Sequence, residues 1–211
     1  SQQTRVNQGL QYFLQFATKY PSVQKLANAK LQDVLKLWQG LGYYSRARNM
    51  HHTAKDIVKN YDGKFPHEYT ELLKLKGVGE YTAAAIASIC FAKPHPVVDG
   101  NVERVLSRYF GIKLQPNSPE AKKKFTSIAG ERMGKYPPAE FNQAMMEFGA
   151  LQCAPKNPDC SVCPFNKTCF AFTQKQVDKF PAKKIKPKIR QRYFDYLVLH
   201  HQKKIYLRKR T

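Results

Sequence analysis

Cys153-Ala-Pro-Lys-Asn-Pro-Asp-Cys160-Ser-Val-Cys163-Pro-Phe-Asn-Lys-Thr-Cys169 is the stretch that decides how this chain is interpreted. It places four cysteines within 17 residues, with six, two and five residues between them. Soft thiolate ligands held this close together either bind a metal centre or oxidise. The chemistry of this loop therefore determines which fold is expected around it.

Three chemistries compete for the four cysteines. Disulfides need an oxidising compartment, and a fifth cysteine, Cys90, falls in an apolar helical pattern that gives no support for one. Four-thiolate zinc sites usually contain two C-x2-C pairs with a longer spacer, whereas this loop has one such pair. A compact single loop suits a [4Fe–4S] cube, in which each iron takes one thiolate, although the spacing is not that of ferredoxins.

The charge of the chain points to a polyanionic partner. Lys and Arg number 36 against 15 Asp and Glu, a net charge of +21. Residues 174–211 carry 13 basic and 2 acidic side chains, which also suits a solvated linker. The remaining residues, 1–173, are also basic. Solubility alone is the other explanation for their positive charge, but acidic surfaces serve solubility better. The longest apolar run, residues 83–92, is too short to span a bilayer, so we expect no membrane association.

Apolar residues recur at helical spacing through residues 1–173, which predicts an all-α body. The expected helices cover residues 6–17, 31–38, 50–61, 69–75, 81–92, 102–109 and 141–150, with one more beginning at Ser118-Pro119-Glu120. The segment from Tyr81 to Ala92 is apolar nearly all round, so we expect a buried central helix.

The sequence changes character near its C-terminal end. Residues 174–192, with Pro181 and Pro187 among many basic residues, predict an extended linker. Two strand-like runs follow, Tyr193–Leu199 and Ile205–Leu207. A lone hairpin is not stable by itself, so we expect residues 193–211 to begin a truncated further domain. A helical pattern is already running at Gln3, which predicts truncation at the front as well.

Leu75-Lys-Gly-Val-Gly79 lies between two expected helices and predicts a helix–hairpin–helix over about residues 70–92. Glycines permit a tight turn that exposes the backbone amides of Gly77, Val78 and Gly79 at a helix start, where they bind phosphate without reading sequence. Two glycines alone also suit a simple turn. An Asp loop within 25 residues and the cysteine loop beyond it make the signal specific.

Together these motifs resemble the endonuclease III superfamily of DNA glycosylases and, within it, the MutY type. The matching stretches are Gln2–Val6, Trp38–Arg48, Gly77–Thr82, Val98–Val102, Phe141–Gln143 and the four cysteines. The resemblance implies a two-lobed, all-α helix–hairpin–helix glycosylase fold over residues 1–173. It implies that one lobe holds the hairpin, and that the other lobe holds both ends of the catalytic part together with a [4Fe–4S] cluster. The cluster ligands would be Cys153, Cys160, Cys163 and Cys169. It also implies that residues 193–211 begin a MutT-like domain that recognises 8-oxoguanine.

Asp99 is the first candidate for catalysis. Taken alone, it is better explained as the N-cap of the expected helix over residues 102–109, with Asn101 as the rival cap. The resemblance implies that the Asp99 carboxylate stabilises the cationic sugar left when the base departs, as carboxylates do in glycoside cleavage. The same resemblance places Asn101 and Tyr81 in the catalytic group.

Tyr81 and a missing acid define the expected activity. Family members that also cut the backbone carry a Lys at this position, and Tyr81 cannot form their Schiff base, which implies a monofunctional glycosylase. Packing at a helix start is the other explanation for Tyr81. The family's catalytic Glu aligns three positions before Ser1, so we expect the chain as printed to bind DNA but excise poorly. Glu103 replaces a frequent Lys, and we expect it near the DNA backbone.

Five residues are expected to contact the bases of the duplex. Gln3 and Tyr43 resemble the side chains that wedge into the stack, and Gln2, Thr4 and Leu41 fall where the family contacts the orphaned base. A polar helix face for the glutamines and core packing for Leu41 and Tyr43 are the alternatives.

The sequence thus predicts a monomeric DNA repair glycosylase that excises adenine mispaired with 8-oxoguanine or guanine in double-stranded DNA. We expect it in the bacterial cytoplasm, with the nucleoid. The alternatives are a pyrimidine-directed, endonuclease III-like glycosylase with lyase activity, and a non-catalytic DNA-binding module that uses the cluster and hairpin as scaffold.

Overall fold

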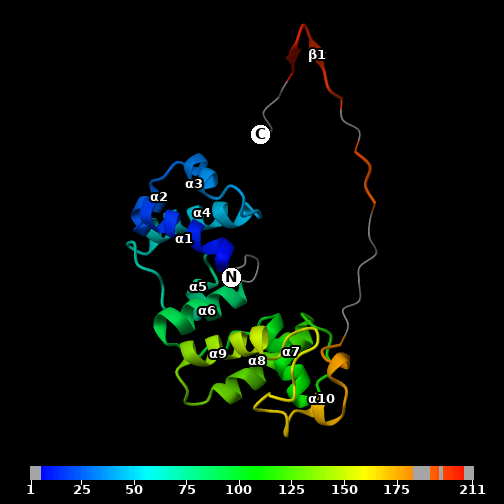
Figure 1. Ribbon diagram of the computed structural model, residues 1–211. Coiled ribbons are helices and arrows are strands. Elements are labelled where there is room, and N and C mark those ends of the chain that lie inside the picture. Colours follow the sequence, from blue (N-terminus) through cyan, green and yellow to red (C-terminus); the bar gives the residue numbers. More distant parts are fainter. Residues whose placement is uncertain (1–5, 183–190, 195–196, 207–211) are drawn as a thin grey trace.

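The structure is a computed structural model, which describes residues 6–182, 191–194 and 197–206 and the side chains from residue 9 onward. Helices form the body, and one short hairpin stands apart from it near the C-terminal end (Figure 1). Gln2, Gln3 and Thr4 lie outside the described residues. Among the helices that are described, none combines the length and apolar character needed to cross a membrane.

The first lobe contains α1 (Val6–Lys19), α2 (Val23–Ala27), α3 (Leu31–Leu37) and α4 (Ser45–Asn60), the upper part of the helical body in Figure 1. Its core is built from small and branched side chains of α2, α3 and α4, with Val34 and Ala47 fully buried. The expectation that the N-terminal helix joins the cysteine loop is wrong. Phe16 of α1 packs edge-on against Trp38, so α1 belongs to the first lobe.

Helices α5 (Tyr69–Leu72) and α6 (Glu80–Phe91) lie in the middle of the molecule. Leu72, Leu75 and Ala83 pack with Ile57 of α4 into a second core. The prediction that α6 is buried all round is wrong at its C-terminal end, where Ile89 is 50% exposed. Neighbouring elements cover only the face of α6 that carries its alanines and Ser88.

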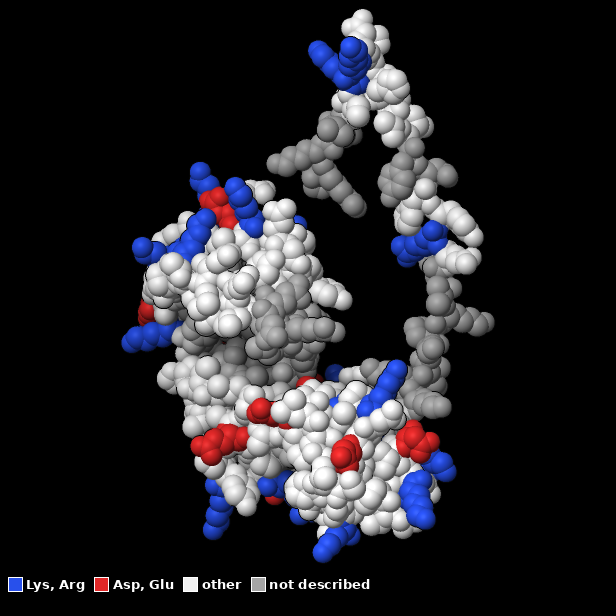
Figure 2. Space-filling view, in the orientation of Figure 1, with Lys and Arg blue, Asp and Glu red and all other residues white. Residues whose placement is uncertain are grey.

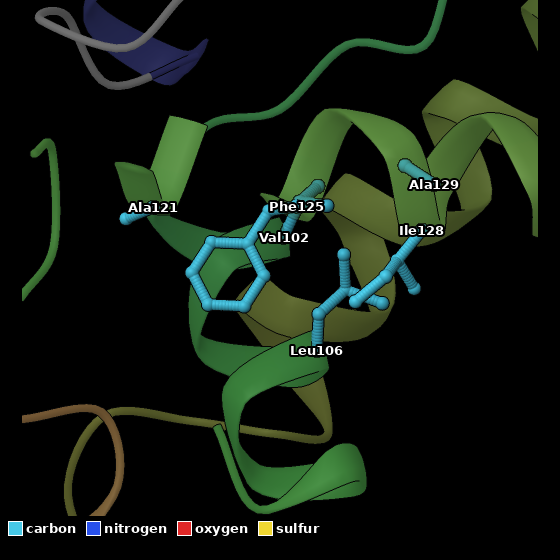
Figure 3. Packing of buried hydrophobic residues seen from close by; sticks show 6 residues of the cluster. All are labelled: Val102, Leu106, Ala121, Phe125, Ile128 and Ala129. Atoms are coloured by element: carbon cyan, nitrogen blue, oxygen red, sulfur yellow. The ribbon is translucent and has the colours of Figure 1, made fainter. Parts of the chain in front are cut away.

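The second lobe is formed by α7 (Gly100–Phe110), α8 (Pro119–Met133) and α9 (Pro138–Leu151). Figure 3 shows Phe125 and Ile128 of α8 directed at Val102 and Leu106 of α7. Burying each such side chain stabilises the fold by roughly 1.5–3 kcal/mol. The predicted start of α8 is confirmed, because the Ser118 side chain accepts a hydrogen bond from the Ala121 N–H at 3.1 Å.

The cysteine loop follows α9 and leads into α10 (Phe170–Thr173) and the 3-10 turn η1 (Val177–Lys179). Phe180 is 2% exposed and meets Phe170 edge-on, with ring centroids 5.9 Å apart. Residues up to Phe180 therefore pack on the helical body, although residues 174–192 were predicted to be an extended linker.

Strands β1 (His200–His201) and β2 (Lys204–Ile205) pair antiparallel, with His200 opposite Ile205. The predicted strand Tyr193–Leu199 is wrong in its bounds, because the ladder includes only the Leu199 carbonyl, which accepts the Tyr206 N–H at 3.0 Å. The predicted second strand begins one residue late, and its end, Leu207, lies outside the described residues. The exposed apolar side chains of this hairpin explain its shortness, since an isolated strand pair is marginally stable.

Candidate active site

Asp99 caps the N-terminus of α7. One carboxylate oxygen accepts hydrogen bonds from the backbone N–H groups of Asn101 at 2.8 Å and Val102 at 2.9 Å. The other accepts from the side-chain amide of Asn101 at 3.0 Å. Both oxygens are thus fixed, and the side chain stays partly accessible. The capping explanation of Asp99 is confirmed, and a carboxylate fixed in this way is also able to support a nearby cation.

Asn101 connects this carboxylate to the interior of the second lobe. Its side-chain oxygen accepts a hydrogen bond from Nη2 of Arg104 at 2.9 Å. The same guanidinium nitrogen donates to the Gly149 carbonyl at 2.6 Å, and Nε donates to the Cys153 carbonyl at 2.8 Å. Burial lowers the pKa of Arg104, while the nearby Cys153 and Asp99 act in the opposite direction. A continuous hydrogen-bonded chain therefore runs from Asp99 to the first cysteine.

The segment leading to Asp99 is fixed by Asn142 of α9, which is 1% exposed. Its side-chain oxygen accepts from the Val97 N–H, and its amide donates to the His95 carbonyl, both at 2.9 Å. The two bonds satisfy backbone polar groups of the extended segment that comes just before the turn capped by Asp99. Asp99 is thus held from both sides along the chain.

Helix α9 brings Tyr81 and Asn101 to one face. Tyr81 lies in the first turn of α6, and its hydroxyl donates to the sulfur of Met146 at 3.6 Å. A side chain at Gly149 would come within 2.7 Å of Cβ of Asn101. Because Met146 and Gly149 are about one turn apart on the helix, Tyr81 and Asn101 both contact the same stretch of α9.

The four loop cysteines line one small cavity of about 40 Å³ beside α7 and α9. The five cysteines of the chain are free in the structure. A single water needs about 10–15 Å³ on the same measure, so the sulfurs surround more space than one atom fills. Within the described residues, no group of three or more His, Cys, Asp or Glu side chains is arranged to hold a single metal ion.

Arg108 joins the cysteine loop to α7. Its Nη1 lies 3.3 Å from the Cys153 sulfur and donates to the Ala154 carbonyl at 2.8 Å. Its Nε donates to the Phe180 carbonyl at 3.1 Å. Burial raises the pKa of the Cys160 thiol, the neighbouring Cys153 raises it further, and the Arg108 charge opposes both. The buried guanidinium thus supplies positive charge where four thiolates would gather.

The helix–hairpin–helix is formed by α5, residues 73–79 and α6. Gly77 has a φ of +82°, and a Cβ there would lie 2.6 Å from Cβ of Asn49, so the turn requires glycine. The buried Thr53 hydroxyl donates to the Lys76 carbonyl at 2.8 Å. Gly79 is the N-cap of α6, and no side chain caps this helix. The first N–H groups of α6 are therefore available to an anion.

Leu41 and Tyr43 lie in the loop between α3 and α4, on the first lobe. Leu41 is half-buried, whereas Tyr43 is 65% exposed, which is inconsistent with core packing. The hairpin also packs on this lobe, through Ile57 of α4. Figure 2 shows one face of the protein, on which Lys and Arg stand mainly toward the periphery.

Two outcomes differ from the sequence analysis. Glu103 is 3% exposed, and its carboxylate accepts from the backbone N–H of Asn117, so the expectation that it faces the DNA backbone is wrong. The sequence analysis did not single out Arg104 or Arg108 as candidate functional residues. Their spacing of four residues on α7, ahead of a cysteine loop, is the only sequence signal that could have drawn attention to them.

Comparison with known proteins agrees with this arrangement. A family model described as "HhH-GPD superfamily base excision DNA repair protein" matches residues 1–130. The chain belongs to the HhH-GPD superfamily. Among curated members, the adenine DNA glycosylase of Buchnera aphidicola from Acyrthosiphon pisum is 38% identical over 210 residues, covering 100% of this chain and 60% of that protein. The human adenine DNA glycosylase is 43% identical over 171 residues, covering 81% of this chain and 31% of that protein.

Solved structures of the superfamily share the fold. A thermostable thymine-DNA glycosylase matches with a TM-score of 0.75 and 28% identity, covering 82% of this chain and 79% of that chain. An endonuclease III in a non-covalent DNA complex matches with a TM-score of 0.71 and 26% identity, covering 83% and 80%. The chain spans about 60% of the length of the bacterial adenine DNA glycosylases that it matches.

Proposed function

We propose that this HhH-GPD chain carries the catalytic region of an adenine DNA glycosylase, which removes adenine mispaired with 8-oxoguanine or guanine from double-stranded DNA. The observation that carries the proposal is the Asp99 carboxylate, fixed at the start of α7 by three hydrogen bonds from Asn101 and Val102. The identity to proteins named adenine DNA glycosylase supports the choice of base.

The chemistry follows from the glycosidic bond. As the base leaves, the sugar becomes an oxocarbenium-like cation, and a fixed carboxylate lowers the energy of that state without having to reorganise. Asp99 supplies this charge. Asn101 holds one of its oxygens and is itself held by Arg104, so the carboxylate keeps its orientation as charge develops.

The second functional group in our proposal is an acid that protonates the departing adenine. By resemblance it is the family's Glu, which aligns three positions before Ser1. Fusing to Ser1 the corresponding segment of a relative, with its Glu, gives a variant that we refer to as the extended chain.

Tyr81 limits the reaction to base removal. A lyase needs an amine that attacks the sugar and forms a Schiff base, and a phenol cannot do so. The Tyr81 hydroxyl instead donates a hydrogen bond to the sulfur of Met146. We therefore propose a monofunctional glycosylase, rather than the pyrimidine-directed glycosylase and lyase.

DNA contacts are assigned to the hairpin and to the loop between α3 and α4. The backbone of Gly77, Val78 and Gly79 binds a phosphate at the start of α6, and Tyr43 and Leu41 contact the bases. Gln2, Gln3 and Thr4, outside the described residues, keep the base contacts that the resemblance implies. Inserted side chains fill the vacancy in the stack when a base is extruded.

The cysteine loop has the residues that a [4Fe–4S] cluster requires. Cys153, Cys160, Cys163 and Cys169 surround a common cavity, and a cube takes one thiolate per iron rather than four at one point. Arg108 offsets the negative charge. When bound, the cluster cross-links the loop and so stabilises its position against α7. Protein purified without oxygen should show broad visible absorption and bound iron; stoichiometric zinc without iron would contradict this assignment.

The activity test uses duplexes with adenine opposite 8-oxoguanine, and matched duplexes with damaged pyrimidines. The extended chain should release free adenine and leave no covalent adduct after borohydride treatment. Pyrimidine release with a trapped adduct would favour the lyase alternative. Tight DNA binding by the extended chain without release of any base would favour the non-catalytic module.

The setting of the protein completes the proposal. The region around the hairpin of β1 and β2 is assigned to a MutT-like module that recognises 8-oxoguanine. The protein acts as a monomer on DNA in the bacterial cytoplasm; the similarity to the Buchnera proteins supports a bacterial source.

A further inference from the structure

The loop between α3 and α4 has an unusual backbone. Gly40 has a φ of +97°, Gly42 of +70° and Tyr43 of +47°. The left-handed region is unfavourable for a residue with a large side chain, so something other than local preference must hold Tyr43 there. The same residue presents its ring to solvent, with 65% of its surface exposed. An exposed aromatic on a strained turn is the feature that requires explanation.

Arg46, in the first turn of α4, lies beneath this turn. The carbon of its guanidinium is 5.6 Å from the Tyr43 ring centroid and 5.4 Å from the Trp38 ring centroid. Its Nη2 reaches the carbonyl oxygens of Leu41 at 3.4 Å and Gly42 at 3.5 Å. One planar cation therefore contacts both aromatic rings and two carbonyls of the loop, a combination that suits arginine.

Two further contacts fix the start and end of the turn. The Trp38 indole donates to the Gly42 carbonyl at 3.1 Å. On the α1 side, the Tyr12 hydroxyl donates to the Gln39 carbonyl at 3.0 Å, and a Cβ at Gly40 would approach that hydroxyl to 2.5 Å. The backbone of the loop is thus anchored on both sides, and the Tyr43 ring depends on Arg46 for its direction.

We propose that Arg46 is a positioning residue for the DNA wedge: it holds the Tyr43 ring over its guanidinium in the direction in which the ring enters the base stack. The inference rests on the proposed function, in which Tyr43 is the wedge. An aromatic side chain that is ordered before binding loses less conformational freedom when it inserts, so more of the binding free energy remains available for extruding the base. Arg46 would thus act through Tyr43 on base extrusion rather than on general DNA affinity.

The replacement Arg46→Lys separates these two effects. Lysine keeps the positive charge, and therefore the long-range attraction to phosphates, but loses the planar group that stacks on rings and spans two carbonyls. Arg46→Met keeps the bulk without the charge and serves as a second variant. Arg48→Lys, at an exposed position of the same helix, is the matched control.

A measurement without DNA tests the contact itself. Trp38 is the only tryptophan of the chain, so its fluorescence reports on the group stacked against it. Arg46→Lys and Arg46→Met should shift Trp38 emission and raise its quenching by acrylamide at least about 1.5-fold, while Arg48→Lys should leave both unchanged. Circular dichroism establishes that each variant is folded. Unchanged Trp38 fluorescence in both folded Arg46 variants would overturn the proposed stacking.

A second measurement tests base extrusion in the absence of catalysis. A duplex carries 2-aminopurine in place of the target adenine, opposite 8-oxoguanine, and its fluorescence rises when the base leaves the stack. At saturating protein, Arg46→Lys should reduce this rise at least two-fold, and Tyr43→Ala should reduce it as much or more. Affinity measured by anisotropy should change less than three-fold for Arg46→Lys, and Arg48→Lys should match the wild type in both readouts.

The outcomes distinguish this inference from the proposed function. A full rise in 2-aminopurine fluorescence with Arg46→Lys, alongside a reduced rise with Tyr43→Ala, overturns the positioning role alone. No rise with the wild-type chain, or no loss with Tyr43→Ala, overturns the wedge on which the inference rests. A loss of affinity for Arg46→Lys equal to its loss of fluorescence would make Arg46 a simple phosphate contact and would also overturn the proposal.

Discussion

Helix α7 and helix α4 support the two parts of the proposed site in different ways. On α7, the buried side chains of Arg104 and Arg108 each make several hydrogen bonds to distant backbone, and Asp99 stands at the end of that network. On α4, Arg46 and Thr53 hold exposed turns through a few contacts each. The difference suggests that changes along α7 will alter stability and chemistry together, whereas changes along α4 will alter DNA binding with little loss of stability.

The largest effect is expected in the cysteine loop. Cys160→Ala removes one of four thiolates, so the iron content should fall by more than half and the melting temperature by about 10 °C. Iron analysis and thermal melting measure both. Cys90→Ala, which changes an exposed thiol outside the loop, is the control and should leave both values unchanged. Retention of full iron content in Cys160→Ala would show that this cysteine is not a ligand.

Arg108→Met tests the buried side of the comparison. The change leaves the carbonyls of Ala154 and Phe180 without their charged donor, and hydrogen bonds to charged groups are worth roughly 1.5–3 kcal/mol each. We expect a loss of about 3–5 kcal/mol in the free energy of unfolding. Arg132→Met is the control, since this exposed arginine only lies over the Phe110 ring and should cost less than about 1 kcal/mol. Equal losses for the two variants in urea unfolding would remove the distinction between buried and exposed arginines.

Thr53→Val tests the α4 side. The substitution keeps the shape of the side chain but removes the hydrogen bond to the Lys76 carbonyl, at a cost of about 1 kcal/mol. The hairpin amides then align less well with a phosphate, so the DNA dissociation constant should rise about three- to five-fold while the melting temperature changes little. Anisotropy titrations at fixed salt measure the affinity, with the exposed Thr70→Val as control. A stability loss without any change in affinity would count against the assignment of the hairpin to DNA.

Glu68→Gln should have the smallest effect. Glu68 accepts a hydrogen bond from Lys93 at 2.6 Å, and this bond, followed by the Lys93 charge, lowers the pKa of the Glu68 carboxyl. A lowered folded-state pKa stabilises the fold above the unfolded-state pKa, and the contribution disappears as the pH falls through the folded-state value. Because both groups are exposed, we expect a barely measurable lowering of the melting temperature at pH 7 that vanishes in acid and in high salt. If the difference in melting temperature between Glu68→Gln and the parent grew as the pH fell, this explanation would be contradicted.

Local signals in the sequence predicted most of the helical body. The cap at Ser118, the hairpin at Gly77 and the stop after Tyr61 each depend on neighbours in sequence, and the structure has helix boundaries at all three places. The short α2 was not predicted, because five residues carry too little periodicity to recognise. The lobe predicted for α1 was also wrong, because the amphipathic pattern of a helix does not identify the surface on which that helix packs.

The sequence predicted those candidate site residues that belong to a recognisable motif. It did not predict the residues whose importance depends on being buried in the folded protein. Asp99 and the four cysteines were proposed because their motifs resemble those of a known family. Arg104 and Arg108 resemble surface residues, because charged side chains are rarely buried unless they are paired. Their partners are backbone carbonyls about 45 or more residues further along the chain, and only the folded structure brings them together.

The most direct test compares Asp99→Asn with the unmodified side chain in the extended chain, by single-turnover release of adenine from a duplex with 8-oxoguanine opposite adenine. Asparagine is also a good N-cap, so the melting temperature and the DNA affinity should stay close to those of the parent. The account predicts that the rate of adenine release falls at least about 100-fold. A rate within three-fold of the parent would contradict the role of Asp99, and with it the proposed mechanism.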